Sequence, residues 1–109
     1  MDPATNGSNA GANLTLEEIL ASRARLPRHV VYRPFVSETV LLNLETGLYH
    51  GVNPVGGRML EALEAAVDVR TAAAALANEF GVPRAQIERD IAGFCAGLLE
   101  RKLIELGTP

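Results

Sequence analysis

A change of hydrophobic period near residue 53 constrains this chain more than any other feature. Before it, three short runs rich in Val, Leu, Tyr and Phe cover residues 29–37, 38–47 and 48–53. After it, apolar residues recur every three to four positions as far as residue 104. Short alternating runs are typical of strands, and the longer period is typical of helices. The order predicts an α+β fold in which a three-stranded antiparallel sheet packs on a three-helix bundle.

The second strand-like run suggests both a pairing and a buried face. It ends at Gly47, which suits a short hairpin loop to the third run because glycine tolerates positive φ. Apolar and polar residues alternate along most of the run, although Leu41 does not fit, and we expect the alternating apolar set to face the core. That set is Val40, Leu42 and Leu44. Pro34 cannot donate in a ladder, so the first run is predicted to be an edge strand or to bend near its end.

Helix boundaries are signalled by single residues. Asn53 followed by Pro54 is a typical helix start, and this helix is expected to end near Val67. An alanine-rich helix is predicted for residues 70–80 because Gly81 follows it. Pro83 opens the last helix. That helix carries one narrow apolar seam, formed by Ile87, Ile91, Phe94 and Leu98.

The N-terminal part divides into two segments. Residues 1–13 combine Asn, Gly, Ala, Ser and Pro without an apolar period, which predicts a disordered tail. Residues 14–27 predict an extra helix, since Thr15 and Glu18 match a capping box and Pro27 ends the pattern. The domain itself is then expected to span residues 28–106.

Composition narrows the function. The chain has 109 residues, enough for one small core, with a net charge of −3 and a pI near 5.3. Nucleic-acid binders usually present a basic face, so this balance argues against them. His29, His50 and the single Cys95 are too scattered for a metal site, and we expect no cofactor and no enzymatic activity. Without a signal peptide or a long apolar run, the expected location is cytoplasmic, with no membrane partner.

Several local features have an ordinary structural interpretation. His50 is expected to be a partly exposed sheet residue, and Cys95 a small buried hydrophobe. Gly56 and Gly57 lie just inside a helix, where glycine costs about 1 kcal/mol each relative to alanine. Close approach of the third strand would explain them, because no phosphate-binding motif is complete.

Two short-linked helices beside a sheet also suggest a winged helix-turn-helix that binds DNA. The exposed positions of the last helix include Glu88 and Asp90, whose carboxylates repel phosphate. The strands also precede all three helices, whereas wings usually follow them. A DNA-binding regulator therefore stays only as an alternative.

The third strand-like run has an unprotected edge. Leu48–Val52 contains no charge and no proline, and Gly51 leaves room for another backbone. An open edge beside an apolar helix is the geometry of β-augmentation, in which an extended peptide adds a strand. The alternatives are that the N-terminal helix or a second copy of the chain covers this edge.

These residues resemble the PqqD-like family, named for the pyrroloquinoline quinone synthesis protein D. The resemblance covers about residues 28–106 and is spread along the chain. The matching positions are Thr46-Gly47, Tyr49, Val52-Asn53, Gly56, Asp90-Ile91, Phe94, Leu98 and Leu103-Ile104. The resemblance implies a winged-helix-like βββααα domain that is not itself catalytic. It also implies that this domain recognises ribosomally synthesised, post-translationally modified peptides.

The resemblance also implies a partner and a site. The leader of a precursor peptide is expected to add to the third strand, in a groove shared with the last helix, and to be presented to a separate enzyme. The chain looks most like the stand-alone leader-binding proteins of lasso-peptide biosynthesis, which favours a leader peptidase over a radical-SAM enzyme. The expected binding residues are Leu48, Tyr49, His50, Gly51, Val52, Arg84, Ile87, Glu88, Asp90, Ile91, Phe94 and Cys95.

Two departures from the family pattern lead to further expectations. His50 and Gly51 stand where bulkier residues are expected, which would either widen the groove or reflect a different leader. The helix predicted for residues 14–27 lies outside the common core, and one hypothesis is that it occupies the peptide site in the free protein. The chain is expected to be a monomer or a weak dimer.

Overall fold

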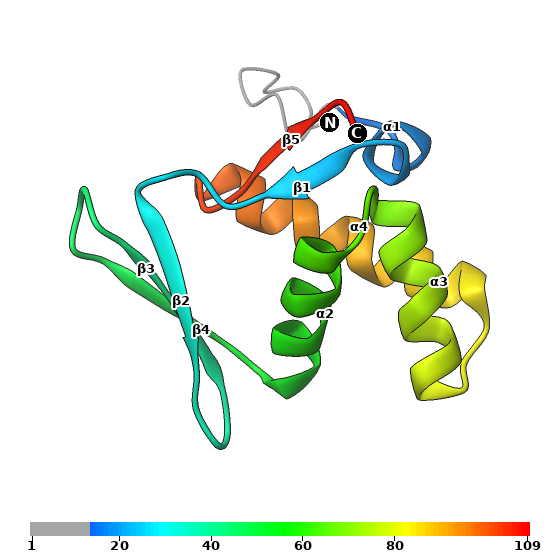
Figure 1. Ribbon diagram of the computed structural model, residues 1–109, viewed down its shortest axis with the longest axis horizontal. Helices are drawn as coiled ribbons and strands as arrows, with labels where there is room; N and C mark the ends of the chain where they lie inside the picture. Colours follow the sequence, from blue (N-terminus) through cyan, green and yellow to red (C-terminus); the bar gives the residue numbers. More distant parts are fainter. Residues whose placement is uncertain (1–13) are drawn as a thin grey trace, which may run out of the picture.

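A three-stranded sheet stands beside a bundle of three long helices, and a two-stranded ribbon lies across the bundle (Figure 1). The computed structural model describes residues 14–109. In chain order the elements are α1 (Leu16–Leu20), β1 (Arg23–Arg25), β2 (Val30–Pro34), β3 (Thr39–Asn43), β4 (Tyr49–Val52), α2 (Pro54–Ala65), α3 (Val69–Phe80), α4 (Arg84–Glu100) and β5 (Glu105–Gly107). The predicted α+β, winged-helix-like fold is confirmed.

The helices begin and end where local chemistry predicts. Asn53 caps α2, because its Oδ1 accepts a hydrogen bond from the Gly56 N–H at 2.8 Å. Asp68 caps α3 in the same way, accepting from the Thr71 N–H at 2.7 Å. Gly81 follows α3 with φ of +68°, the left-handed conformation that glycine adopts without strain. These caps fix the lengths of the helices on which the sheet rests.

The buried face of the sheet is the opposite of the one predicted. Leu41 is fully buried and Thr39 is 6% exposed, whereas Leu44, from the set expected inside, is 58% exposed. The other two residues of that set, Val40 and Leu42, are partly exposed. The buried face of β3 carries Leu41 between the polar residues Thr39 and Asn43, so alternation along the strand points to the other face. The choice is made by α2, which packs against Thr39 at Gly57.

The N-terminal helix is much shorter than predicted. Its capping box is present, with the Glu18 N–H donating to Thr15 Oγ1 at 3.1 Å and the Thr15 N–H donating to Glu18 Oε1 at 2.9 Å. However, α1 ends at Leu20, and residues 23–25 form β1 instead of continuing the helix. Strand β1 pairs antiparallel with β5, placing Ala24 opposite Leu106. This long-range pairing outweighs the local helical pattern.

This N-terminal segment packs into the fold. Ile19 and Leu20 of α1 are buried, and α1 contacts α3 and α4. No residue of α1 lines the space beside β4. The hypothesis that this segment occupies the peptide site therefore does not hold in this structure. The tail predicted for residues 1–13 lies outside the described residues.

Candidate functional site

Strand β4 forms one edge of the sheet and directs two pairs of backbone groups outward. It pairs only with β3, with Leu42 opposite Tyr49 and Val40 opposite Gly51. The Asn43 N–H donates to the Leu48 carbonyl at 2.9 Å, which makes this pair a hydrogen-bonded one. Because hydrogen-bonded and non-hydrogen-bonded pairs alternate along an antiparallel ladder, the N–H and C=O groups of Tyr49 and Gly51 point away from β3. The β4 edge therefore offers two donors and two acceptors.

The opposite edge of the sheet, formed by β2, is blunted. The Leu44 N–H donates to the His29 carbonyl at 2.7 Å, so the same alternation directs the backbone groups of Tyr32 and Pro34 outward. Pro34 has no N–H to offer, which removes one donor from this edge and makes it a poor template for another strand. The prediction that the first strand lies at an edge is confirmed, and the better template is the β4 edge.

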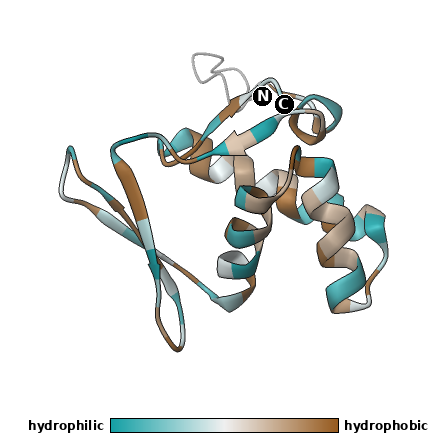
Figure 2. Cartoon of the chain, in the orientation of Figure 1, coloured by the Kyte–Doolittle hydropathy of each residue, from teal (hydrophilic) through white to brown (hydrophobic). Residues whose placement is uncertain are grey.

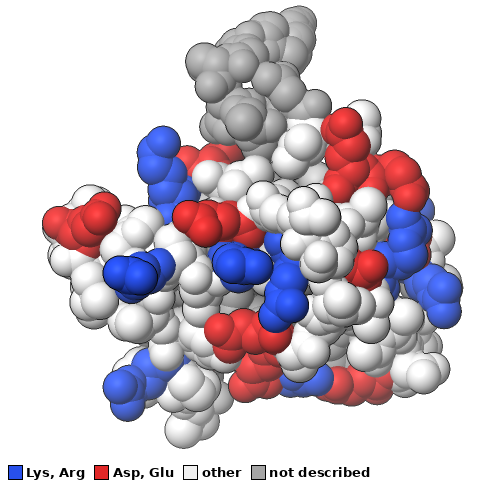
Figure 3. Space-filling view, turned by 45° about the horizontal axis from the view of Figure 1, so that its top comes forward, with Lys and Arg blue, Asp and Glu red and all other residues white. Residues whose placement is uncertain are grey.

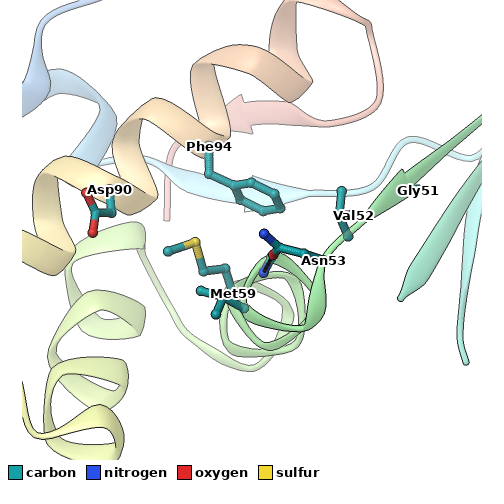
Figure 4. A pocket seen from close by; sticks show the side chains of 8 residues that line it. Gly51, Val52, Asn53, Met59, Asp90 and Phe94 are labelled. Atoms are coloured by element: carbon teal, nitrogen blue, oxygen red, sulfur yellow. Dashed lines mark hydrogen bonds between the residues drawn. The ribbon is translucent and has the colours of Figure 1, made fainter. Parts of the chain in front are cut away.

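A groove of about 530 Å³ runs beside β4, bounded by the start of α2 and the first half of α4. Figure 4 shows Phe94 from α4 and Met59 from α2 pointing into the same space, with Val52 at its strand end. Phe94 and Val52 are half-buried, so their apolar surface lines the groove without being closed off. The lining residues are Gly51, Val52, Asn53, Val55, Gly56, Met59, Asp90 and Phe94.

Gly56 allows these walls to come together. A Cβ atom at this position would lie 3.1 Å from the Val52 Cβ and 3.2 Å from the Phe94 Cε1. Both distances are shorter than ordinary carbon–carbon contacts, so any larger residue would push the phenyl ring or the strand away from α2. The glycine pair thus serves close approach, as predicted. The neighbours are side chains of β3, β4 and α4, whereas the sequence suggested the backbone of the third strand.

The groove carries a single charge. Asp90 is exposed and lies one helical turn before Phe94, at the end of the groove away from the strand (Figure 4). The other lining side chains are apolar, apart from the amide of Asn53, which is engaged in capping α2. Such a surface suits a ligand that places an apolar side chain in the groove and a cationic or N–H group near Asp90. Over the face shown in Figure 3, acidic and basic side chains are interspersed, without the basic cluster that nucleic-acid binding favours.

Three of the predicted site residues lie in the core. Ile87, Ile91 and Cys95 are 3%, 0% and 0% exposed, and they pack inside the bundle rather than along the groove. Burial raises the pKa of the Cys95 thiol to about 12, so the thiol stays protonated at neutral pH. Ordinary packing explains this part of the α4 seam, and Phe94 is its member that reaches the groove.

The remaining predicted residues spread over three places. Gly51, Val52, Asp90 and Phe94 line the groove. Tyr49 is 72% exposed and His50 is half-buried on β4, and Leu48 precedes that strand. Arg84 lines a separate hollow with residues of α3, and Glu88 is half-buried outside the groove lining.

Four lining residues were not predicted. They are Asn53, Val55, Gly56 and Met59. All four follow β4 directly, at the start of α2, where the sequence indicates only a helix start at Asn53 and a glycine pair at Gly56 and Gly57. A helix that begins immediately after an edge strand must pass beside that edge, which is the signal that could have located them.

Within residues 14–109, no three His, Cys, Asp or Glu side chains are grouped so that they could hold a metal ion. No helix of that same part of the chain has the length and hydropathy needed to span a bilayer.

The fold and groove define a small winged-helix-like domain with an open strand edge beside a helical wall. The chain belongs to the PqqD family: the sequence profile described as "Coenzyme PQQ synthesis protein D (PqqD)" matches residues 38–104. The resemblance noted in the sequence is therefore confirmed.

Two solved structures support the assignment. One, described as TbiB1 in complex with the TbiA(beta) leader peptide, is 33% identical, with a TM-score of 0.68 over 74% of this chain and 94% of that chain. Another, described as lasso peptide synthetase B1 complexed with the leader peptide, is 25% identical, with a TM-score of 0.69 over 76% and 98% of the two chains. No curated protein matches the sequence.

Proposed function

We propose that this protein binds the leader segment of a ribosomally synthesised precursor peptide and presents it to a separate processing enzyme. The leader adds as a fourth strand to the open edge of β4. Its alternate side chains point toward the groove between β4, α2 and α4. The protein contributes recognition, and the partner enzyme contributes the chemistry.

The observation that carries this proposal is the coincidence of the open edge and the groove. Tyr49 and Gly51 direct their backbone groups outward at the edge, and Gly51 also lines the groove. A strand added there places every second side chain on the same side as Phe94. Main-chain hydrogen bonds and side-chain pockets are the two components of peptide recognition by β-augmentation.

Simple magnitudes show why both components are needed. The two outward-facing residues supply up to four hydrogen bonds, worth about 1 kcal/mol each and about 4 kcal/mol together. That corresponds to a dissociation constant of about 1 mM, whereas micromolar binding requires about 8 kcal/mol. Because association also costs translational and rotational freedom, the difference requires the burial of at least two apolar side chains, at about 1.5–3 kcal/mol each. The groove beside Phe94 and Met59 is where we place those anchors.

We assign the orientation of the leader to Asp90. It is the one charged residue of the groove lining, and it lies at the end away from Val52. A cationic leader group at that end would be held by the carboxylate, and one at the other end would not. Such exposed charges act on the association rate and on specificity more than on affinity.

The favoured partner is a leader peptidase of lasso-peptide biosynthesis. The support comes from the two similar solved structures, one of them described as a lasso peptide synthetase B1 bound to a leader peptide. A radical-SAM peptide-modifying enzyme is the competing partner, because the family is named after a protein of coenzyme PQQ synthesis. Leader-dependent cleavage of the precursor by a purified peptidase, against leader-dependent modification, separates the two.

Strand addition is tested by comparing Tyr49→Pro with Tyr49→Ala. Both remove the phenol, but only proline removes the outward N–H of residue 49. The ladder to β3 does not use that N–H, and the same sheet already holds Pro34 at an outward position of β2. We therefore expect both variants to keep the wild-type circular dichroism spectrum.

The probe is the fluorescein-labelled leader of the precursor peptide encoded beside this protein. Strand addition predicts that Tyr49→Pro weakens binding at least tenfold relative to Tyr49→Ala. Equal affinities for the two folded variants would show that the leader does not pair with the β4 edge.

A further inference from the structure

Gly51 leaves a gap on the face of the sheet that the helices do not cover. It pairs with Val40, whereas the next pair along the strands, His50 with Leu41, lies on the side where Leu41 is fully buried. Because side chains alternate between the two faces of a strand, a side chain at position 51 would point to the uncovered side. We call this side, which carries Arg33, Val40 and Gly51 in one cross-strand row, the outer face.

A carboxylate fills the gap. Glu38 comes directly before β3, and its Oε1 occupies the space that a Cβ atom of residue 51 would take. Any side chain at position 51 would displace it. Glu38 is exposed, and within residues 14–109 the ion pairs are formed by Arg58 and Arg70, neither of which pairs with Glu38. The glycine thus brings a negative charge to the open edge of β4.

The open edge places one leader residue beside this carboxylate. Gly51 directs its N–H and C=O groups outward, so it forms a hydrogen-bonded pair with the leader residue opposite it. Paired residues direct their side chains to the same face, with Cβ positions about 5 Å apart. The leader side chain opposite Gly51 therefore shares the outer face with the Glu38 carboxylate. The leader residues before and after it point to the other face, where the groove lies.

The other charge in this row lies farther from the leader. Arg33 is opposite Val40 in β2, two strands or about 10 Å from Gly51, and it forms no ion pair with Glu38. Hydrophobic and hydrophilic segments alternate along the sheet (Figure 2), so this side of it is not uniformly apolar. Opposite charges on neighbouring strands stabilise a pairing, and like charges destabilise it. Glu38 should therefore favour a cation opposite Gly51 and disfavour an acid.

We infer that Glu38 selects a Lys or Arg residue of the leader at the position that pairs with Gly51. The inference rests on the proposed function and narrows its ligand to a leader in which a cationic residue stands between two residues that face the groove. The long stems of Lys and Arg carry their charge across the strand spacing to the carboxylate. Asp90 lies in the groove, on the other side of the added strand, so the two carboxylates contact different leader residues.

A charge scan of the leader tests the inference. Each residue of the fluorescein-labelled leader is replaced in turn by Lys and by Glu, and both affinities are measured at low ionic strength, where exposed charges are least screened. The proteins are the full chain, Glu38→Gln and the control Glu105→Gln, which removes the same charge from an exposed position of β5. Glutamine keeps the size of the side chain, and the Glu38 carbonyl that accepts from the Phe35 N–H is unchanged, so both variants are expected to fold.

At one leader position, the wild-type chain should bind the Lys peptide at least about fivefold more tightly than the Glu peptide, as expected when an exposed ion pair replaces a like-charge pair. This ratio should fall below about twofold with Glu38→Gln and stay unchanged with Glu105→Gln, and the ratios at the two adjacent positions should not depend on residue 38.

A scan in which no ratio depends on residue 38 would overturn the inference and leave strand addition intact. A control variant that lowers the same ratio equally would also overturn it, because the effect would then come from net charge. Failure of the wild-type chain to bind the unmodified leader would instead overturn the proposed function.

Discussion

At the scale of single residues, the distance between the sheet and α2 depends on Gly57, because glycine has no side chain. Gly57 faces Thr39 of β3, and a Cβ atom there would lie 2.5 Å from Thr39 Oγ1 and 3.3 Å from its Cβ. Thr39 is buried, so it cannot turn away into solvent. Real carbon–oxygen contacts are longer than 3 Å, and one of the two elements would have to move.

Gly57→Ala is therefore expected to destabilise the protein by about 1–3 kcal/mol, the usual cost of overpacking. Gly93→Ala is the matched control, because Gly93 lies in α4 with open space around it, and alanine there should stabilise by about 1 kcal/mol. Urea unfolding measures both changes. Adding Thr39→Ala should recover part of the loss, and a Gly57→Ala variant as stable as wild type would contradict the close approach.

Cys95 yields a second prediction at this scale. Its pKa is raised to about 12 by burial, and the side chain is 0% exposed. The native thiol should react with a disulfide reagent at pH 8 at least about 100-fold more slowly than the thiol of the chain unfolded in guanidinium, since both thiolate and access are lacking. Comparable rates in the two states would place Cys95 at the surface after all.

At the scale of elements, the sequence predicts what is local. The start of α2, the end of α3 at Gly81 and the capping box at Thr15 all depend on residues within four positions of one another. The β1–β5 ribbon could not be predicted, because it joins segments about 80 residues apart and each strand has only three residues. The prediction of the buried face of β3 was wrong for a similar reason, since that face depends on where α2 packs.

The cap of α3 gives a prediction with a pH dependence. Hydrogen bonds from the side chain and backbone of Thr71 lower the pKa of Asp68 below its ordinary value. A lowered native pKa means that the carboxylate stabilises the fold above the unfolded-state pKa of about 4, and that this contribution is lost as the pH falls through the native pKa.

Asp68→Ala should therefore cost about 1 kcal/mol at pH 7 and less at pH 3. Asp68→Asn keeps an uncharged acceptor, so the stability that its cap contributes should change little between pH 7 and pH 3. Thermal unfolding of the three proteins at both pH values measures the effect. A cost for the alanine variant that is the same at both pH values would exclude the charged cap.

At the scale of the whole molecule, the N-terminal segment joins the helices to the C-terminal strand. Ile19, Leu20 and Ala24 are at most 4% exposed, and Glu17 forms an ion pair with Arg70 of α3. Exposed pairs of this kind contribute little, so the burial carries the effect. Two large buried side chains correspond to about 3–6 kcal/mol, a large share of the 5–15 kcal/mol of a typical domain.

Removing residues 1–26 should therefore abolish or strongly lower the cooperative thermal transition. Removing residues 1–13 leaves every described contact in place and is the control, with a melting temperature close to that of the full chain. If the shorter deletion is the one that unfolds the protein, the ribbon and α1 are not what stabilises it.

The site could be predicted only in part, again for reasons of scale. The open edge at Leu48–Val52 follows from local composition, because no charge or proline protects it. The lining of the groove depends on how α4 crosses α2, so Phe94 and Asp90 could not be separated from the core residues Ile87, Ile91 and Cys95 by spacing alone. Met59 is buried and also lines the groove, which its helical spacing alone does not reveal.

The central claim is that a leader peptide pairs with the outward backbone groups of β4. The most direct test is amide hydrogen exchange, followed by NMR, of the full chain with and without its leader peptide. Protection of the Tyr49 and Gly51 amides should rise at least tenfold on binding. The amide of Tyr32, outward at the opposite edge, should not change. A bound leader that leaves Tyr49 and Gly51 exchanging as fast as before would contradict strand addition at β4.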